Sequence, residues 1–187
     1  MNRLCACLYA LLLAVFALSS TANAIEKPNI DLYKGTLNGR VFYDLTLDDV
    51  TDMLGRPSTV QETPFEQEKQ VSVMDYKNLG IAFFCGRKGS PFKCVNMFIN
   101  FSNKNILGLP SSGKFQGTIS ENINKEWKVK RVMEAFKKFN PKLDNTVQDG
   151  KLILKNVTVD FKTHRVDFIH EPTTEFLDML RFVPNKK

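Results

Sequence analysis

The chain has 187 residues and a formal net charge of +6, and it is 43% hydrophobic and 25% charged. It is too apolar for a disordered chain and too charged for a membrane protein with several spans. Its length suits one ordinary hydrophobic core, or two small cores that share an interface.

Residues 1–24 have the pattern of a secretory signal peptide. A positive residue, Arg3, precedes an apolar run over 4–18, and small residues end in Ala-x-Ala at Ala24. We therefore expect cleavage after Ala24 and export, most concretely to a bacterial periplasm. A retained anchor is the rival interpretation. A lipoprotein is not expected, because no cysteine stands at the cleavage point.

Residues 25–108 are expected to form a first unit. Segments 30–36 and 40–44 flank Asn38-Gly39, which is a strong two-residue hairpin signal. Thr46 is expected to cap a helix that stops at Gly55, because Pro57 prevents its continuation. Three strands are expected to follow, over 71–76, 80–85 and 94–101.

Residues 114–187 are expected to form a second unit, packed with the first. An amphipathic helix is predicted over 125–139, then strands over 151–154, 156–161 and 166–170, and a short helix within 173–182. The order of elements resembles that of the first unit, although any small domain can alternate in this way. The predicted fold is α+β: an antiparallel sheet with helices packed on one face, built from a tandem pair of similar helix–meander units.

The segment 45–57 carries the pattern T-x-x-x-V-x-x-x-L-G-x-P, from Thr46 through Val50, Leu54 and Gly55 to Pro57. It resembles the helix of small envelope domains that include the SmpA/OmlA (BamE-type) proteins and the β-lactamase inhibitory protein fold. The resemblance implies one or two helices on an antiparallel sheet. It also implies a role either in outer-membrane assembly or in blocking another secreted protein.

Two cysteines, Cys85 and Cys94, remain after removal of the signal peptide. In an oxidising compartment, a disulfide is the default expectation. A metal site would need further ligands, and no histidine lies nearby in sequence. A nucleophilic cysteine would need a nearby base and a lowered pKa.

The strands that carry these cysteines predict two different faces. If Cys85 lies opposite Cys94, antiparallel pairing puts Phe83 opposite Asn96. One face is then wholly apolar and is expected to be core: Ala82, Phe84, Val95, Met97, Ile99 and Phe101. The other face carries the candidates for partner binding: Phe83, Asn96, Phe98 and Asn100. Because large aromatic residues are more often buried, a second core layer is the first interpretation of this face, and an open binding face is the functional alternative.

Two basic segments are candidate partner contacts. The loop over 86–91 holds Arg87 and Lys88 but lacks the phosphate-loop pattern, so it is interpreted as a solvated hairpin tip. The basic helix over 125–139 is interpreted first as a solvated face and second as a contact for an acidic partner or an anionic membrane surface. No nucleic-acid partner is expected of an exported chain.

The sequence contains no HExxH, GxSxG, CxxC or GxGxxG motif, and its two histidines, His164 and His170, lack catalytic partners at a characteristic spacing. We expect no metal, no cofactor and no catalytic residues. The leading hypothesis is a non-enzymatic module that binds another secreted or envelope protein, most concretely an inhibitor or immunity protein. An envelope assembly or maintenance factor is second, and a periplasmic enzyme is third.

Overall fold

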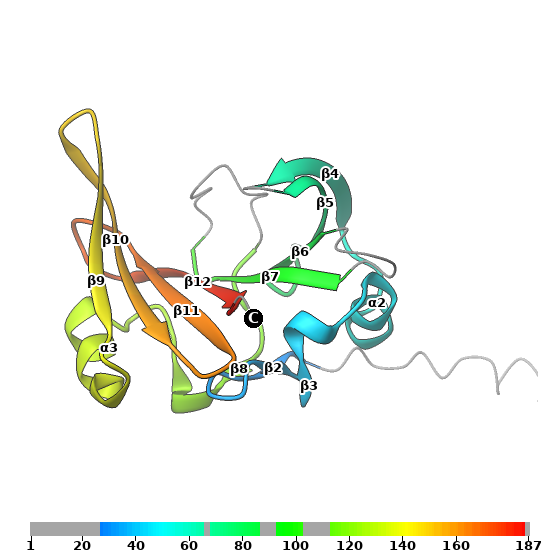
Figure 1. Ribbon diagram of the computed structural model, residues 1–187, viewed down its shortest axis with the longest axis horizontal. Coiled ribbons are helices and arrows are strands. Elements are labelled where there is room, and N and C mark those ends of the chain that lie inside the picture. The colour runs from blue at the N-terminus through cyan, green and yellow to red at the C-terminus, as the bar shows by residue number, and fades with distance from the viewer. Residues whose placement is uncertain (1–26, 66–67, 87–92, 103–112, 186–187) are drawn as a thin grey trace, which may run out of the picture.

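Eight antiparallel strands form the main sheet of the protein (Figure 1). The computed structural model describes residues 27–65, 68–86, 93–102 and 113–185. The strand order across the sheet is β4-β5-β6-β7-β12-β11-β10-β9. Their bounds are β4 (Thr59–Phe65), β5 (Glu68–Tyr76), β6 (Ile81–Gly86), β7 (Lys93–Asn100), β9 (Lys142–Gln148), β10 (Lys151–Asp160), β11 (His164–His170) and β12 (Leu177–Pro184).

The main sheet consists of two four-stranded meanders that meet edge to edge. Strands β4–β7 follow helix α2 (Leu47–Leu54), and strands β9–β12 follow helix α3 (Val129–Ala135). Strand β7 pairs with β12, with Ile99 opposite Leu180. The contacts between the two chain halves at this junction are therefore nonlocal.

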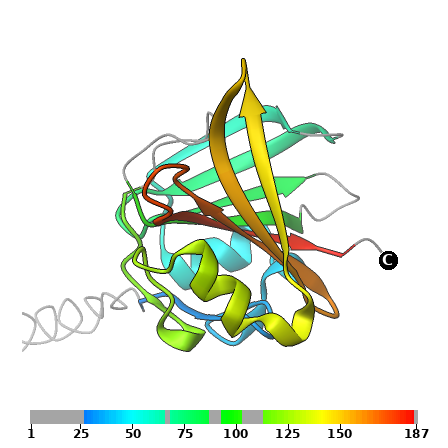
Figure 2. The same cartoon turned by 90° about the vertical axis from the view of Figure 1, so that its left-hand side faces the viewer.

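A second, small sheet lies on the same side of the main sheet as both helices (Figures 1 and 2). Its strands, in the order β3-β2-β1-β8, are β1 (Asn29–Asp31), β2 (Thr36–Leu37), β3 (Arg40–Val41) and β8 (Thr118–Ile119). The turn between β2 and β3 is Asn38-Gly39, with positive φ at both residues, as the hairpin signal predicts. Three short 3₁₀ turns complete the described elements: Phe42–Asp44, Ser120–Asn122 and Lys137–Phe139.

The principal core fills the space between the main sheet and these covering elements. Phe136 of the α3 segment packs on Phe161 and Phe168, with ring centroids 6.2 and 5.3 Å apart. Val50 and Leu54 supply the buried face of α2. A smaller apolar cluster lies on the opposite face of the main sheet: Val71, Val73, Ala82, Phe84, Phe98, Ile169 and Met179.

The predicted α+β class is wrong, because strands dominate the described fold. Helices α2 and α3 span only eight and seven residues, too short to cover an eight-stranded sheet. The helix expected over 125–139 is reduced to α3 and a 3₁₀ turn, and the expected tail helix is strand β12. Strand β9 was not predicted, because its polar sequence carries little strand propensity.

Candidate functional site

A β-bulge sets the faces of the β6–β7 hairpin. Cys85 lies opposite Cys94 as expected, but the register then shifts by one residue, so Phe84 rather than Phe83 lies opposite Asn96. The extra residue is Val95. The bulge changes which β7 side chains share a face with those of β6: Met97 lies opposite Phe83 in the principal core, whereas Phe98 joins Phe84 in the cluster on the other face.

The two cysteines are buried as free thiols, with Sγ atoms 2.6 Å apart. The hydrogen bond to Cys85, together with burial, raises the pKa of the Cys94 thiol well above its ordinary value. A raised pKa suppresses the thiolate, which is the nucleophilic form. The geometry therefore suits pairing of the two sulfurs and does not suit a nucleophilic role for Cys94.

The residues proposed for partner binding do not share one exposed face. Phe83 is fully buried in the principal core, whereas Phe98 lies on the opposite face with an exposed fraction of 3%. Asn96 and Asn100 are also buried. Arg87 and Lys88 lie outside the described residues.

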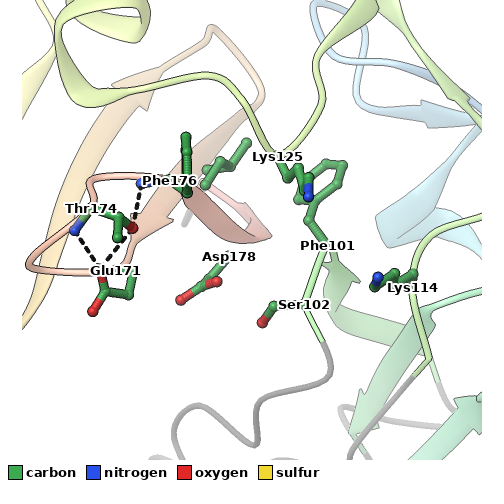
Figure 3. Close-up of a pocket in the computed structure, with 9 residues that line it drawn as sticks. Phe101, Ser102, Lys114, Lys125, Glu171, Thr174, Phe176 and Asp178 are labelled. Carbon is green, nitrogen blue, oxygen red and sulfur yellow. Dashed lines mark hydrogen bonds between the residues drawn. The ribbon is translucent and has the colours of Figure 1, made fainter.

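A pocket of about 430 Å³ lies where β7 ends and β12 begins (Figure 3). Its described lining residues are Phe101, Ser102, Lys114, Lys125, Glu171, Thr174, Phe176, Leu177 and Asp178. The Glu171 carboxylate accepts hydrogen bonds from the backbone N–H of Thr173 at 3.0 Å and from the Thr174 hydroxyl at 2.7 Å. Glu171 thus organises the turn before β12, and no histidine or cysteine is among the described residues that line this pocket.

Both histidines are buried in structural positions. His164 Nε2 lies 3.0 Å from the Leu32 carbonyl oxygen, and its ring stacks on Phe161 with centroids 5.0 Å apart. His170 is fully buried, and within the described part of the chain neither of its ring nitrogens has a hydrogen-bond partner. Burial lowers the pKa of both imidazoles, so both are neutral near pH 7.

The basic residues around α3 are partly engaged by aromatic rings. The Arg131 guanidinium lies 4.3 Å from the Trp127 ring centroid, and Lys138 Nζ lies 5.5 Å from that of Tyr33. Lys128 Nζ lies 5.4 Å from the Phe176 ring centroid. These cations therefore cover the rim of the core with their side chains, in addition to providing positive charge.

The hairpin formed by β9 and β10 projects beyond the rest of the sheet (Figures 1 and 2). Its tip is Asp149-Gly150, with φ of 50° and 73°, which suits a two-residue hairpin turn. All seven residues of β9 are exposed. Burial on β10 begins only toward its carboxyl end, where Val157 and Val159 reach the principal core.

Four large apolar side chains on this hairpin are exposed, and one of them, Ile153, is the extra residue at the bulge in β10. The other three lie on one face of the hairpin, and we call them the apolar stripe. Leu143, Val147 and Leu152 have exposed fractions of 45%, 59% and 38%. Leu143 lies opposite the core residue Val157, and Val147 lies opposite Leu152. Side chains opposite one another share a face, so the stripe continues the core face of the sheet outward past α3.

The apolar stripe is a candidate binding surface that lies outside the site residues predicted from the sequence. The signal was present: Asp149-Gly150 stands between segments that carry Leu143, Val147 and Leu152. An Asp-Gly pair between such segments is a strong hairpin indicator. The predicted elements nevertheless run from a helix over 125–139 directly to a strand over 151–154, with none between them.

The described residues contain no group of three or more His, Cys, Asp or Glu side chains placed to hold a metal ion. Among the same residues, no helix has the length and apolarity needed to cross a membrane.

Comparison with known proteins identifies no family for this chain. No family model and no curated protein matches it. Among solved structures, it is similar to an extracellular protein containing a SCP domain from Bacillus anthracis str. Ames, with 11% identity and a TM-score of 0.49. That match covers 76% of this chain and 44% of the other, so the chain spans less than half of that protein.

Two further solved structures are similar at the same level. A DUF4309 family protein from Bacillus subtilis has 11% identity and a TM-score of 0.46, over 82% of this chain and 90% of the other. A cysteine-rich secretory protein from Staphylococcus aureus has 10% identity and a TM-score of 0.42, over 76% and 44%. At these values the matches carry no argument about function.

The resemblance to SmpA/OmlA (BamE-type) and β-lactamase inhibitory protein-like domains is wrong. No family model matches the chain, and its described fold is mostly β, with an eight-stranded main sheet and two short helices. The pattern over 45–57 is explained by the local requirements of a short capped helix. Thr46 and Asp49 form a capping box and Gly55 ends the helix at a φ of 77°, as in any well-capped short helix.

Proposed function

We propose that this protein is an exported, non-enzymatic binding module that recognises another secreted or envelope protein, most concretely as an inhibitor or immunity protein. The signal-peptide pattern over residues 1–24 supports export to the periplasm. The observation that carries the binding role is the apolar stripe on the projecting β9–β10 hairpin.

The physical argument rests on the cost of exposing this stripe. Three large aliphatic side chains on one face lose the stabilisation that burial would give, which is about 25 cal/mol for each Å² of apolar surface removed from water. Exposed apolar groups that cluster beside a polar surround are typical of protein-binding sites. Asn145 and Lys155 lie opposite one another on the same face, between Leu143 and Val147, and form the polar part of this surface.

A capture experiment with matched variants tests the proposal. The tagged mature protein is crosslinked in periplasmic extract of its own source, alongside Val147→Lys and Val60→Lys. Val60 is the matched control, because it is 58% exposed on β4, at the opposite edge of the same sheet. We expect one stoichiometric secreted or envelope protein with the wild type and Val60→Lys, and at least about tenfold less with Val147→Lys, equivalent to about 1.4 kcal/mol.

Three other outcomes are informative. Equal capture by Val147→Lys would remove the hairpin from the binding site. Recovery of outer-membrane assembly components would favour the assembly role over inhibition. Failure to retain any stoichiometric partner would overturn the binding proposal.

A further inference from the structure

The outer backbone edge of β9 pairs with no other strand among the residues that the structure describes. Strand β9 is the last strand of the eight-stranded sheet, and β10 is its one partner within that part of the chain. Its seven residues contain neither proline nor glycine. Natural sheets usually protect such an edge with proline, a bulge or charged side chains, and of these β9 has only the charges of Lys142 and Asp144.

The other edge of the same sheet carries that protection. Strand β4 contains Pro64, and its register with β5 shifts between Thr63 and Phe65. Proline cannot donate a ladder hydrogen bond, and a bulge twists the edge away from an incoming strand. The β9–β10 pair also contains a bulge, but its extra residue, Ile153, belongs to β10. Strand β9 itself is therefore continuous.

Charge on the hairpin also differs from that of the whole chain. Residues 142–160 contain three lysines (Lys142, Lys151 and Lys155) and three aspartates (Asp144, Asp149 and Asp160), whereas the chain carries +6. Two copies that approach through their hairpins therefore avoid the repulsion that two positively charged surfaces would produce.

The sequence of β9 is complementary to itself in one antiparallel register. Centred on Asn145, a second copy places Leu143 opposite Val147, and Val147 opposite Leu143. The remaining pairs are Lys142 with Gln148 and Asp144 with Thr146, so no charge lies directly opposite a like charge. Centring the pair on Asp144 instead would place that carboxylate opposite its own copy.

We propose that the β9 edge pairs with the β9 edge of a second copy in the Asn145-centred register, which joins two eight-stranded sheets into one continuous sheet. This inference rests on the proposed function. Edge pairing uses backbone groups and leaves side chains on their faces. The two apolar stripes therefore form one larger apolar face for the partner protein.

The dimer is tested by a charge exchange at the symmetry axis. Asn145 is exposed, so substitutions there leave the core intact. Analytical ultracentrifugation of the mature protein at concentrations from about 1 µM to about 1 mM detects dimers with dissociation constants within that range, including weak ones. We expect the wild type to dimerise reversibly, and Asn145→Lys and Asn145→Asp each to weaken dimerisation at least about tenfold, or about 1.4 kcal/mol. An equimolar mixture of the two variants restores a dimer, because the lysine then meets the aspartate.

Two further variants complete the experiment. Gln61→Lys, on the protected edge strand β4, is the matched control and leaves dimerisation unchanged. In the proposed register, Asp144 lies one diagonal step from the second copy's Asp144, at about 7–8 Å. Asp144→Asn therefore tightens the dimer.

A wild type that remains monomeric throughout the concentration range overturns the dimer, as does an Asn145→Lys variant that dimerises normally. The partner-binding proposal is judged separately, by the capture experiment with Val147→Lys. A monomer that still captures its partner through the apolar stripe would refute only the dimer. A dimer that captures no partner would refute only the proposed function.

Discussion

Cys85 lies directly opposite Cys94 across strands β6 and β7, with their Sγ atoms 2.6 Å apart in the core. The bulge at Val95 begins immediately beyond this pair. The pair therefore lies where the hairpin register changes, and a covalent bond there would hold the register on both sides.

The disulfide remains a prediction, and it is tested by removing both sulfurs. Cys85→Ser combined with Cys94→Ser is expected to lower the free energy of unfolding by about 2–4 kcal/mol without abolishing the fold. Denaturant unfolding measures the loss. Reductant should destabilise the wild type and leave the double variant unchanged. Two titratable thiols in the native exported protein would contradict the disulfide.

Phe98 provides a test of the buried layer on the second face. Its ring lies 4.9 Å from that of Phe84, and its exposed fraction is 3%. Phe98→Ala is expected to cost about 3–5 kcal/mol of stability, because it opens a cavity in packed surroundings. Val60→Ala, at an exposed site, should stay within about 0.5 kcal/mol in the same unfolding experiment. A Phe98→Ala protein as stable as the wild type would show that this face is not packed.

The capping box of α2 predicts a stability effect at Thr46. The Thr46 hydroxyl accepts a hydrogen bond from the Asp49 backbone N–H, and the Asp49 carboxylate accepts one from the Thr46 N–H. Thr46→Ala is expected to destabilise the protein by about 1 kcal/mol. Thr46→Ser keeps the hydroxyl and should recover most of the loss. Equal stability of the alanine and serine variants would contradict the cap.

Asp49 predicts a stability change in acid. Hydrogen bonds from the Thr46 backbone N–H and from Arg40 lower the pKa of this carboxyl from 3.8 to about 2. Because the folded pKa lies below the unfolded one, the contribution is complete above pH 3.8 and is lost as pH falls to about 2. Asp49→Asn should therefore be less stable than the wild type at neutral pH, and the two should converge near pH 2. A constant difference across this range would refute the assignment.

His170 predicts a separate change at milder acidity. Burial lowers the pKa of its imidazole below the ordinary value of 6.5, so the unfolded chain binds a proton that the folded chain resists. Stability contributed by the neutral ring is present above pH 6.5 and declines as pH falls from there toward the lowered pKa. His170→Leu should flatten this decline, as followed by denaturant midpoints, and His164 accounts for what remains. Identical pH profiles for wild type and variant would contradict the prediction.

Local features of this protein could be predicted from sequence because their causes are local. The Thr46 cap, the Gly55 stop and the Asn38-Gly39 turn each depend on a few adjacent residues, and the structure confirms all three. The opposition of Cys85 and Cys94 follows from two strands joined by a short connection. Burial of Val157 and Val159 follows from simple alternation along β10.

Tertiary contacts decided the rest of the fold and the candidate site. The tail over 177–184 is a strand because it pairs with β7 on one side and β11 on the other. Strand β11 directly precedes it, but β7 lies far away along the chain, so local sequence does not reveal that partner. One extra residue in β7, Val95, brought Met97 onto the principal-core face with Phe83 and put Phe98 on the opposite face with Phe84, since side chains alternate with a period of two. Leu143 is exposed although it lies opposite the buried Val157, because β9 is the outermost strand of the sheet. The position of a strand in the sheet is set by tertiary pairing, so alternation alone could not distinguish Leu143 at the surface from Val157 in the core.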